Sequence, residues 1–135
     1  MTLKKGYRNV YDLNLHLVLV TKERKKVINR AMLTRLNEIF EATCQKWRST
    51  LTDFNGEENH VHLLVSYPPD VEVSKLVNNL KTVSSRLIRK EFADEVNAIY
   101  KKPVFRSGAY FVASCGGVTV DQLKAYVEQQ DSPVD

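Results

Sequence analysis

The stretch ENHVHLLV, residues 58–65, is the part of the sequence that decides the fold. Side chains along a strand point alternately to its two faces, so His60 and His62 share one face. The residues that alternate with them are all apolar, namely Val61, Leu63 and Val65. We therefore predict a strand over about residues 59–66, with the apolar face in the core and both imidazoles on the opposite face.

The segments next to this stretch predict a neighbouring strand and a sharp end. Residues 50–56 predict a strand that ends near Asn55-Gly56, a dipeptide typical of tight turns between strands. Pro68-Pro69 ends the histidine strand, because proline has no N–H to donate to a sheet. The two strands should therefore be joined by a short turn.

Residues 10–20, VYDLNLHLVLV, alternate just as strictly and predict another strand. Leucines and Tyr11 occupy one of its faces, and His16 lies on the other. Residues 30–49 and 72–92 carry apolar side chains at helical spacing instead, which predicts two amphipathic helices.

The segment of residues 93–115 has weaker signals. Within residues 93–109, Pro103 and Gly108 favour a loop with room for a short helical piece, and residues 110–115 predict a fourth strand. The resulting order, β-α-β-β-α-β, is the ferredoxin-like, RRM-like α+β pattern, in which an antiparallel sheet carries its helices on one face. Polar side chains on the other, open face would need a partner or a purpose.

A separate helix is predicted after Gly116-Gly117, from about residue 120 to 130. Thr119 is a suitable N-cap, and Gln122 three residues later completes a capping box. Two glycines allow large backbone changes, so they predict a hinge, although a plain turn explains them equally well. We expect one domain, residues 1–135, in which this C-terminal helix lies within residues 118–131.

Composition sets broad limits on function. The chain has 135 residues, 43% of them hydrophobic, and a net charge of +4 from 20 basic and 16 acidic residues, which is compatible with a polyanion partner. No apolar run approaches the ~18–20 residues of a membrane span, and the N-terminal segment lacks a signal peptide's apolar core. Cys44 and Cys115 lack metal-binding spacing and should be reduced. We expect a cytoplasmic protein with no membrane partner.

Two pairs of residues could form part of a metal-binding or catalytic site. His60 and His62 could hold a divalent metal, although a short His-x-His pair without a ligand is the commoner case. Tyr126 and Gln130 are spaced i, i+4 and share one face of the last helix, where packing and surface roles are ordinary alternatives. A phenol, with a pKa of about 10, is a weak nucleophile at neutral pH unless a metal polarises its target, for example a phosphodiester.

Four motifs that follow one another in order give the chain a specific resemblance. They are His-hydrophobic-His at 60–62, Ser-Ser-Arg at 84–86, Tyr-Phe-Val at 110–112 leading to Gly-Gly, and Tyr-x-x-x-Gln at 126–130. Together they resemble the single-tyrosine HUH-superfamily transposases (TnpA type), which the smallest insertion sequences encode and which act on single-stranded DNA. The resemblance extends from about Tyr11 to Gln130, nearly the whole chain.

The resemblance implies roles for individual residues. His60, His62 and Gln130 would be ligands of Mg²⁺ or Mn²⁺, and Tyr126 would be the nucleophile. Its attack would leave a 5′-phosphotyrosine and a free 3′-hydroxyl, so that DNA at hairpin-bearing element ends is cut and rejoined. Members of the family act as homodimers, and in several of them the tyrosine helix of one subunit completes the other subunit's site.

Basic residues in two segments could bind the phosphates of hairpin DNA. They are Lys22, Arg24, Lys25, Lys26, Lys81, Arg86 and Arg89. Such residues are usually only solvated, and it is the resemblance that favours DNA. One departure from the family pattern is Asn59, where many relatives carry an aspartate before the first histidine.

Three alternative functions remain open at the level of sequence. A host-domesticated relative that processes chromosomal repeat hairpins would use the same residues. A metal hydrolase without a covalent intermediate is a weaker option. A non-catalytic RRM-like nucleic-acid-binding domain would need aromatics on its central strands, whereas the predicted open face has His60, His62, Leu64 and Ser66.

Overall fold

The computed structural model describes residues 4–5, 10–11 and 13–114, with the side chains described from 13 to 107. The predicted hinge at Gly116 and Gly117, the helix within 118–131, and with it Tyr126 and Gln130, lie outside the described residues. The single-domain extent, the hinge and the tyrosine helix therefore stay predictions.

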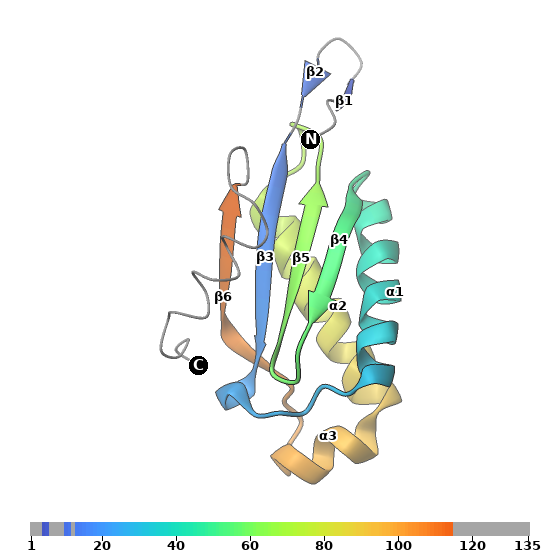
Figure 1. The fold of residues 1–135 in the computed structure, drawn as a ribbon, viewed down its shortest axis with the longest axis vertical. Coiled ribbons are helices and arrows are strands. Elements are labelled where there is room, and N and C mark those ends of the chain that lie inside the picture. The colour runs from blue at the N-terminus through green and yellow to red at the C-terminus, as the bar shows by residue number, and fades with distance from the viewer. Residues whose placement is uncertain (1–3, 6–9, 12, 115–135) are drawn as a thin grey trace.

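A four-stranded antiparallel sheet, in the order β4-β5-β3-β6, forms the centre of the protein (Figure 1). Its strands are β3 (Asn14–Thr21), β4 (Thr50–Gly56), β5 (His60–Ser66) and β6 (Arg106–Ser114). A separate two-stranded ribbon pairs β1 (Lys4–Lys5) with β2 (Val10–Tyr11). The histidine strand is thus one of the two central strands of the sheet.

Helices α1 (Arg30–Lys46) and α2 (Val73–Glu91) pack on one face of this sheet; in Figure 1, α2 passes behind the sheet and α1 runs alongside β4. The short helix α3 (Ala93–Tyr100) follows α2, and a 3₁₀ turn, η1 (Lys22–Arg24), follows β3. The predicted α+β order is confirmed, with α3 added between α2 and β6. None of the helices in the described residues has the length and apolar character that a membrane span requires.

The start of α1 is specified locally. Asn29 has extended backbone angles, and its side-chain Oδ1 accepts a hydrogen bond from the N–H of Met32 at 2.9 Å. Asparagine is among the preferred N-cap residues because its side chain satisfies one of the N–H groups that a helix start leaves without a partner. The helix therefore begins at Arg30, as the apolar spacing predicted.

The core lies between the sheet and the two long helices, and it contains the apolar face of β5. Val61, Leu63 and Val65 are 3%, 0% and 0% exposed, which confirms the predicted inward face. The alternating leucines of β3 are buried with them: Leu15, Leu17 and Leu19. Each of these side chains leaves water on folding, which is the main favourable contribution to stability.

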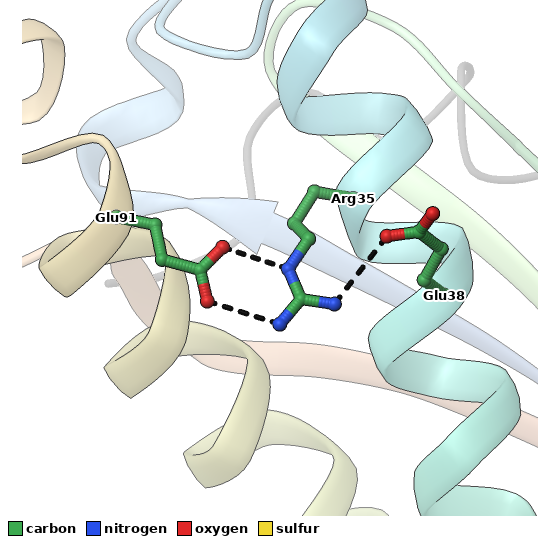
Figure 2. A network of polar contacts seen from close by, with 3 residues as sticks. All are labelled: Arg35, Glu38 and Glu91. Atoms are coloured by element: carbon green, nitrogen blue, oxygen red, sulfur yellow. Dashed lines mark hydrogen bonds and ion pairs between the residues drawn. The ribbon is translucent and has the colours of Figure 1, made fainter.

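An ion-pair network joins the two helices that cover the sheet (Figure 2). Arg35 of α1 donates from Nε to Oε1 of Glu91 at 2.7 Å and from Nη2 to Oε2 at 3.0 Å. A third, longer hydrogen bond of 3.4 Å runs from Nη1 to Glu38, one turn further along α1. The fork of the guanidinium thus clamps the end of α2 against α1 in a two-point geometry.

Two strand boundaries differ from the prediction. The alternating segment 10–20 is divided, because β2 ends at Tyr11 and β3 begins at Asn14. The last strand begins at Arg106 rather than near residue 110, so Gly108 lies inside a strand instead of a loop. Pairing with β3 explains the longer strand: after a register shift, Arg106 is opposite Thr21, and the N–H of Lys22 donates to Phe105 O at 2.9 Å. Gly108 itself lies where the register with β3 shifts, between the pairs Leu19–Tyr110 and Thr21–Arg106, and a glycine inside a strand often marks such an irregularity.

Candidate functional site

The two histidines of β5 lie on the face opposite the core, as predicted, but they are buried. His60 is 7% exposed and His62 only 1%. Both sit on a central strand, so side chains of neighbouring strands flank them on the same face. Val20 stands opposite His60, while Val18 on one side and Asn55 on the other stand opposite His62. The expectation of an open face is therefore wrong for these two imidazoles.

A third histidine joins them from the neighbouring strand. Nε2 of His16, on β3, lies 3.3 Å from Nδ1 of His62, and the two ring centroids are 5.4 Å apart. The rings of His60 and His62 meet edge to face, with centroids 4.9 Å apart. All three histidines of the chain thus form one row, which we call the histidine row.

His60 is oriented by its neighbour in sequence. Its Nδ1 lies 2.7 Å from Oδ1 of Asn59. An amide oxygen can only accept, so this contact places a proton on Nδ1 of His60, and in the neutral form of such a ring the lone pair lies on Nε2. A metal-ligating histidine ordinarily has this arrangement, in which the second nitrogen donates to an oxygen and fixes the ring.

The histidine pair fits part of a metal site. Two imidazoles on one strand face, with the Nδ1 atom of each in contact with a polar neighbour, suit a divalent ion bound through Nε2. No three His, Cys, Asp or Glu side chains within the described part of the chain are grouped to hold a metal. Any further protein ligand must therefore be of another type or come from outside that part, where Gln130 lies.

The charge of His16 is set by its surroundings. Burial lowers the pKa of His16 below its ordinary value, while Asp53 of β4 opposes this by electrostatic attraction. Asp53 shares the face of the histidine row, because it pairs with Leu64, and Leu64 pairs with His16. Burial is the larger effect, so the surroundings of His16 favour the neutral form of its ring.

The turn η1 and helix α3, which lie at the end of the sheet where β5 begins, are followed or formed by basic residues (Figure 1). The turn η1 is tied to this end, since the N–H of Thr21 donates to Asn59 O at 3.0 Å and its hydroxyl donates to Lys25 O at 2.8 Å. Lys25 and Lys26 are exposed there, whereas Lys22 and Arg24 are half-buried. The predicted basic segment thus starts beside the first metal-ligand candidate.

Helix α3 adds two basic residues that the sequence analysis missed. Lys101 and Lys102 are exposed and directly follow Tyr100, whose hydroxyl donates to Lys22 O at 2.8 Å. The Nζ atom of Lys25 lies 5.8 Å from the centroid of the Tyr100 ring. Nothing in the local sequence links these lysines to η1; only the packing of Tyr100 brings them together. We call Lys22, Arg24, Lys25, Lys26, Lys101 and Lys102 the basic end.

The three basic residues predicted on the second helix do not form one solvated surface. Lys81 is only 8% exposed, and burial, together with the nearby positive charge of Arg106, lowers its pKa. Arg89 is half-buried and donates from Nη1 to Pro103 O at 3.0 Å, while Arg86 is exposed. The placement of Lys81 on the polar face was wrong, because that part of α2 packs inward.

Sequence comparison matches the chain to one family along nearly all of its length. The family model described as "Transposase IS200 like" matches residues 9–130. The transposase for insertion sequence element IS200 of Salmonella typhimurium is 22% identical over 120 residues, which cover 89% of this chain and 78% of that protein. The ISDra2 transposase TnpA of Deinococcus radiodurans is 24% identical over 130 residues, covering 96% and 92%.

Solved structures give the same picture of the fold. A crystal structure of a transposase candidate from Deinococcus radiodurans R1 superposes with a TM-score of 0.81 at 26% identity, covering 96% of this chain and 98% of that one. A REP-associated tyrosine transposase, solved bound to a REP hairpin, superposes with a TM-score of 0.58 at 9% identity, covering 93% and 69%. The second likeness concerns the fold alone.

Proposed function

The chain belongs to the IS200-like family of transposases, and on that basis we propose that it is a metal-dependent DNA strand transferase with a tyrosine nucleophile. It cleaves and rejoins single-stranded DNA at hairpin-bearing ends of an insertion sequence. The observation that carries the proposal is the pair His60 and His62, whose Nδ1 atoms both contact polar neighbours. In this arrangement Nε2 is the atom through which each ring would bind the metal ion.

We assign the metal ligands to His60, His62 and Gln130. These three side chains would hold Mg²⁺ or Mn²⁺, and the chemistry that such an ion would supply is polarisation of the scissile phosphate and stabilisation of its developing charge. Mn²⁺ accepts imidazole more readily than Mg²⁺, which favours oxygen. The burial of both imidazoles keeps them in a low-dielectric setting, where electrostatic interactions are stronger than in water.

Tyr126 is the nucleophile in this proposal. Its Oη loses a proton and attacks the phosphorus in line, the bond from phosphorus to the 3′-oxygen breaks, and that oxygen leaves as a 3′-hydroxyl after taking up a proton. The 5′-phosphate stays bound to the tyrosine. Attack by the 3′-hydroxyl of another strand reverses the step and joins new ends, so the bond energy is kept and no nucleotide cofactor is needed.

The basic end is the surface that we assign to the DNA backbone. Lys25, Lys26, Lys101 and Lys102 are exposed at the end of the sheet where β5 begins with His60. Lysines neutralise phosphates without reading sequence, so they position the strand at the site. Arg86 is an exposed second contact, whereas the burial of Lys81 makes it a poor one.

We further propose that the protein acts as a homodimer. A hinge at Gly116-Gly117 would let the helix within residues 118–131 reach the histidine row of the partner subunit. The active site would then be completed in trans.

The experiment that tests this function uses labelled single-stranded hairpin DNA from the gene's own locus with Mn²⁺, followed by a denaturing gel. We expect a covalent protein–DNA band that is absent in Tyr126→Phe and in His60→Ala or His62→Ala, with the far-UV circular dichroism of each variant unchanged. Tyr67→Phe is the matched control and should keep the band. Cleavage that persists in Tyr126→Phe would overturn the assignment of the nucleophile.

A further inference from the structure

His16 is placed to act on His62 from a strand far away in sequence. It lies on β3, opposite Leu64, and its Nε2 meets Nδ1 of His62 diagonally across the strand pair at 3.3 Å. His16 is 2% exposed and His62 is 1% exposed, so the contact is screened from water. A polar contact in such a setting is strong, and the loss of one partner costs more than it would at the surface.

The two facing nitrogens can share only one proton, so the position of that proton decides what His62 can do. If His16 held it on Nε2, then Nδ1 of His62 would accept, and Nε2 of a neutral His62 would carry an N–H and could not bind a metal. If His62 holds it on Nδ1, its Nε2 has a lone pair for the metal. The second case requires Nε2 of His16 to accept, with its own proton on Nδ1.

We propose that His16 is a positioning residue, which accepts the Nδ1–H of His62 and thereby holds that ring with Nε2 toward the metal. The role parallels that of Asn59, which contacts Nδ1 of His60 at 2.7 Å. One imidazole is thus held from the preceding residue and the other from a neighbouring strand. His16 is no metal ligand through Nε2, because that atom faces His62.

Outer partners of this kind matter for metal affinity. A ligating histidine is fixed in tautomer and ring orientation by the group that accepts its second N–H, and the removal of that group weakens metal binding by roughly 10- to 100-fold. The proposal rests on the metal site assigned above. Its test therefore measures metal binding and proton position rather than DNA cleavage.

The experiment is a Mn²⁺ titration of the full chain, followed by electron paramagnetic resonance, on the wild type and on His16→Phe and His16→Gln. We expect His16→Phe to bind Mn²⁺ roughly 10- to 100-fold more weakly, since phenylalanine keeps a ring but cannot accept a hydrogen bond. His16→Gln should recover part of the loss, because its amide oxygen can accept. Ser66→Ala, on the same face of β5, is the control and should bind like the wild type.

A second measurement needs no variant. In the Mg²⁺-bound wild-type protein, the side-chain ¹³Cδ2 and ¹⁵N signals of His16 should report a neutral ring with the proton on Nδ1. A ring with its proton on Nε2 would overturn the proposal even if the variants failed to fold.

The results separate failure of this inference from failure of the metal site itself. Equal Mn²⁺ affinity in the wild type, His60→Ala and His62→Ala would refute the metal site and the positioning role with it. Loss of affinity in His62→Ala together with wild-type affinity in His16→Phe would refute the role of His16 alone. Loss in His16→Phe with recovery in His16→Gln supports it.

Discussion

Single residues decide how the histidines of β5 can be used. Asn59 and His16 each place one polar atom against an Nδ1 atom, and both contacts are short enough to fix a ring. Neither residue is itself assigned to the reaction. Their effect is to keep the rings of His60 and His62 in one orientation, so that the two imidazoles are already oriented when a metal ion binds.

Substitution of Asn59 should show this effect on the first histidine. We expect Asn59→Ala to weaken Mn²⁺ binding roughly 10- to 100-fold, because Nδ1 of His60 loses its acceptor. Asn59→Asp keeps an acceptor at the same position and should bind at least as tightly as the wild type. Calorimetric titration with Mn²⁺ measures both, and Asn37→Ala, at an exposed position of α1, serves as the control. Unchanged affinity in Asn59→Ala would contradict the orienting role.

At the scale of elements, the two long helices, the turn η1 and the end of α3 matter most. Helices α1 and α2 support the sheet from behind, and Arg35 clamps them together through Glu91 (Figure 2). At the end of the sheet that holds His60, the turn η1 and the end of α3 present the basic end. The histidine row is thus supported on one side and, in the proposed function, approached by DNA from one end.

The clamp between the helices predicts a specific dependence of stability on pH. The hydrogen bonds and charge of Arg35 lower the pKa of Glu91 below its ordinary value of 4.5. Because the pKa is lower in the folded state, the stabilisation is fully present above about pH 4.5 and is lost as the pH falls through the folded pKa.

Glu91→Gln should therefore unfold more easily than the wild type at neutral pH, with the difference shrinking below about pH 4. Urea unfolding at several pH values measures this. The effect should be small, because the Arg35 and Glu91 side chains are 35% and 33% exposed. Glu38→Gln is the control and should do less, since Glu38 is 63% exposed and makes one longer contact of 3.4 Å. A difference that grows toward acid pH would contradict the clamp.

Neutralising the basic end should change how DNA binding depends on salt. In a variant with Lys25, Lys26, Lys101 and Lys102 all replaced by Gln, we expect weaker binding of single-stranded DNA. The slope of log affinity against log salt should become shallower by about 0.7 for each phosphate that the variant no longer neutralises. Fluorescence anisotropy at several salt concentrations measures the slope. Lys46→Gln, at the exposed end of α1, should leave it unchanged, and equal slopes in all three proteins would exclude the basic end as the DNA surface.

At the scale of the whole molecule, the proposed chemistry needs residues from both halves of the chain. The histidine row is built by β3 and β5, while the proposed nucleophile and third ligand lie beyond Ser114. If the C-terminal helix is exchanged between subunits, each active site draws its histidines and its tyrosine from different chains.

This exchange can be tested by mixing two inactive variants. Heterodimers of Tyr126→Phe with His60→Ala/His62→Ala should regain covalent DNA binding, because one of their two sites then has intact histidines and an intact tyrosine. Each variant alone should form no covalent band on a denaturing gel. A mixture that stays inactive, although mass spectrometry shows mixed dimers, would place the tyrosine and the histidines of one site in the same subunit.

Much of the fold could be predicted because its signals are local. A period of two predicted the strands at 10–20 and 59–66, and a period of 3.6 residues predicted both long helices, since each period follows from backbone geometry alone. The strand at 50–56 was predicted from the turn signal at its end. The errors lie where long-range pairing overrides local preference. Local signals favour a loop at Gly108, yet β6 continues through this residue to the pair of Arg106 with Thr21, and Gly108 lies at the register shift between β6 and β3.

In the candidate site too, local features could be predicted from the sequence, whereas long-range contacts could not. By itself the sequence determined the family, the order of the elements and the shared face of His60 and His62, because motifs and alternation can be read along the chain. Only the tertiary structure decided that both imidazoles are buried, that His16 meets His62, that Lys101 and Lys102 join the basic end, and that Lys81 faces inward. These facts depend on the register of separate strands and on helix packing. Both bring residues into contact that are far apart in the sequence, so their spacing along the chain cannot predict the contact.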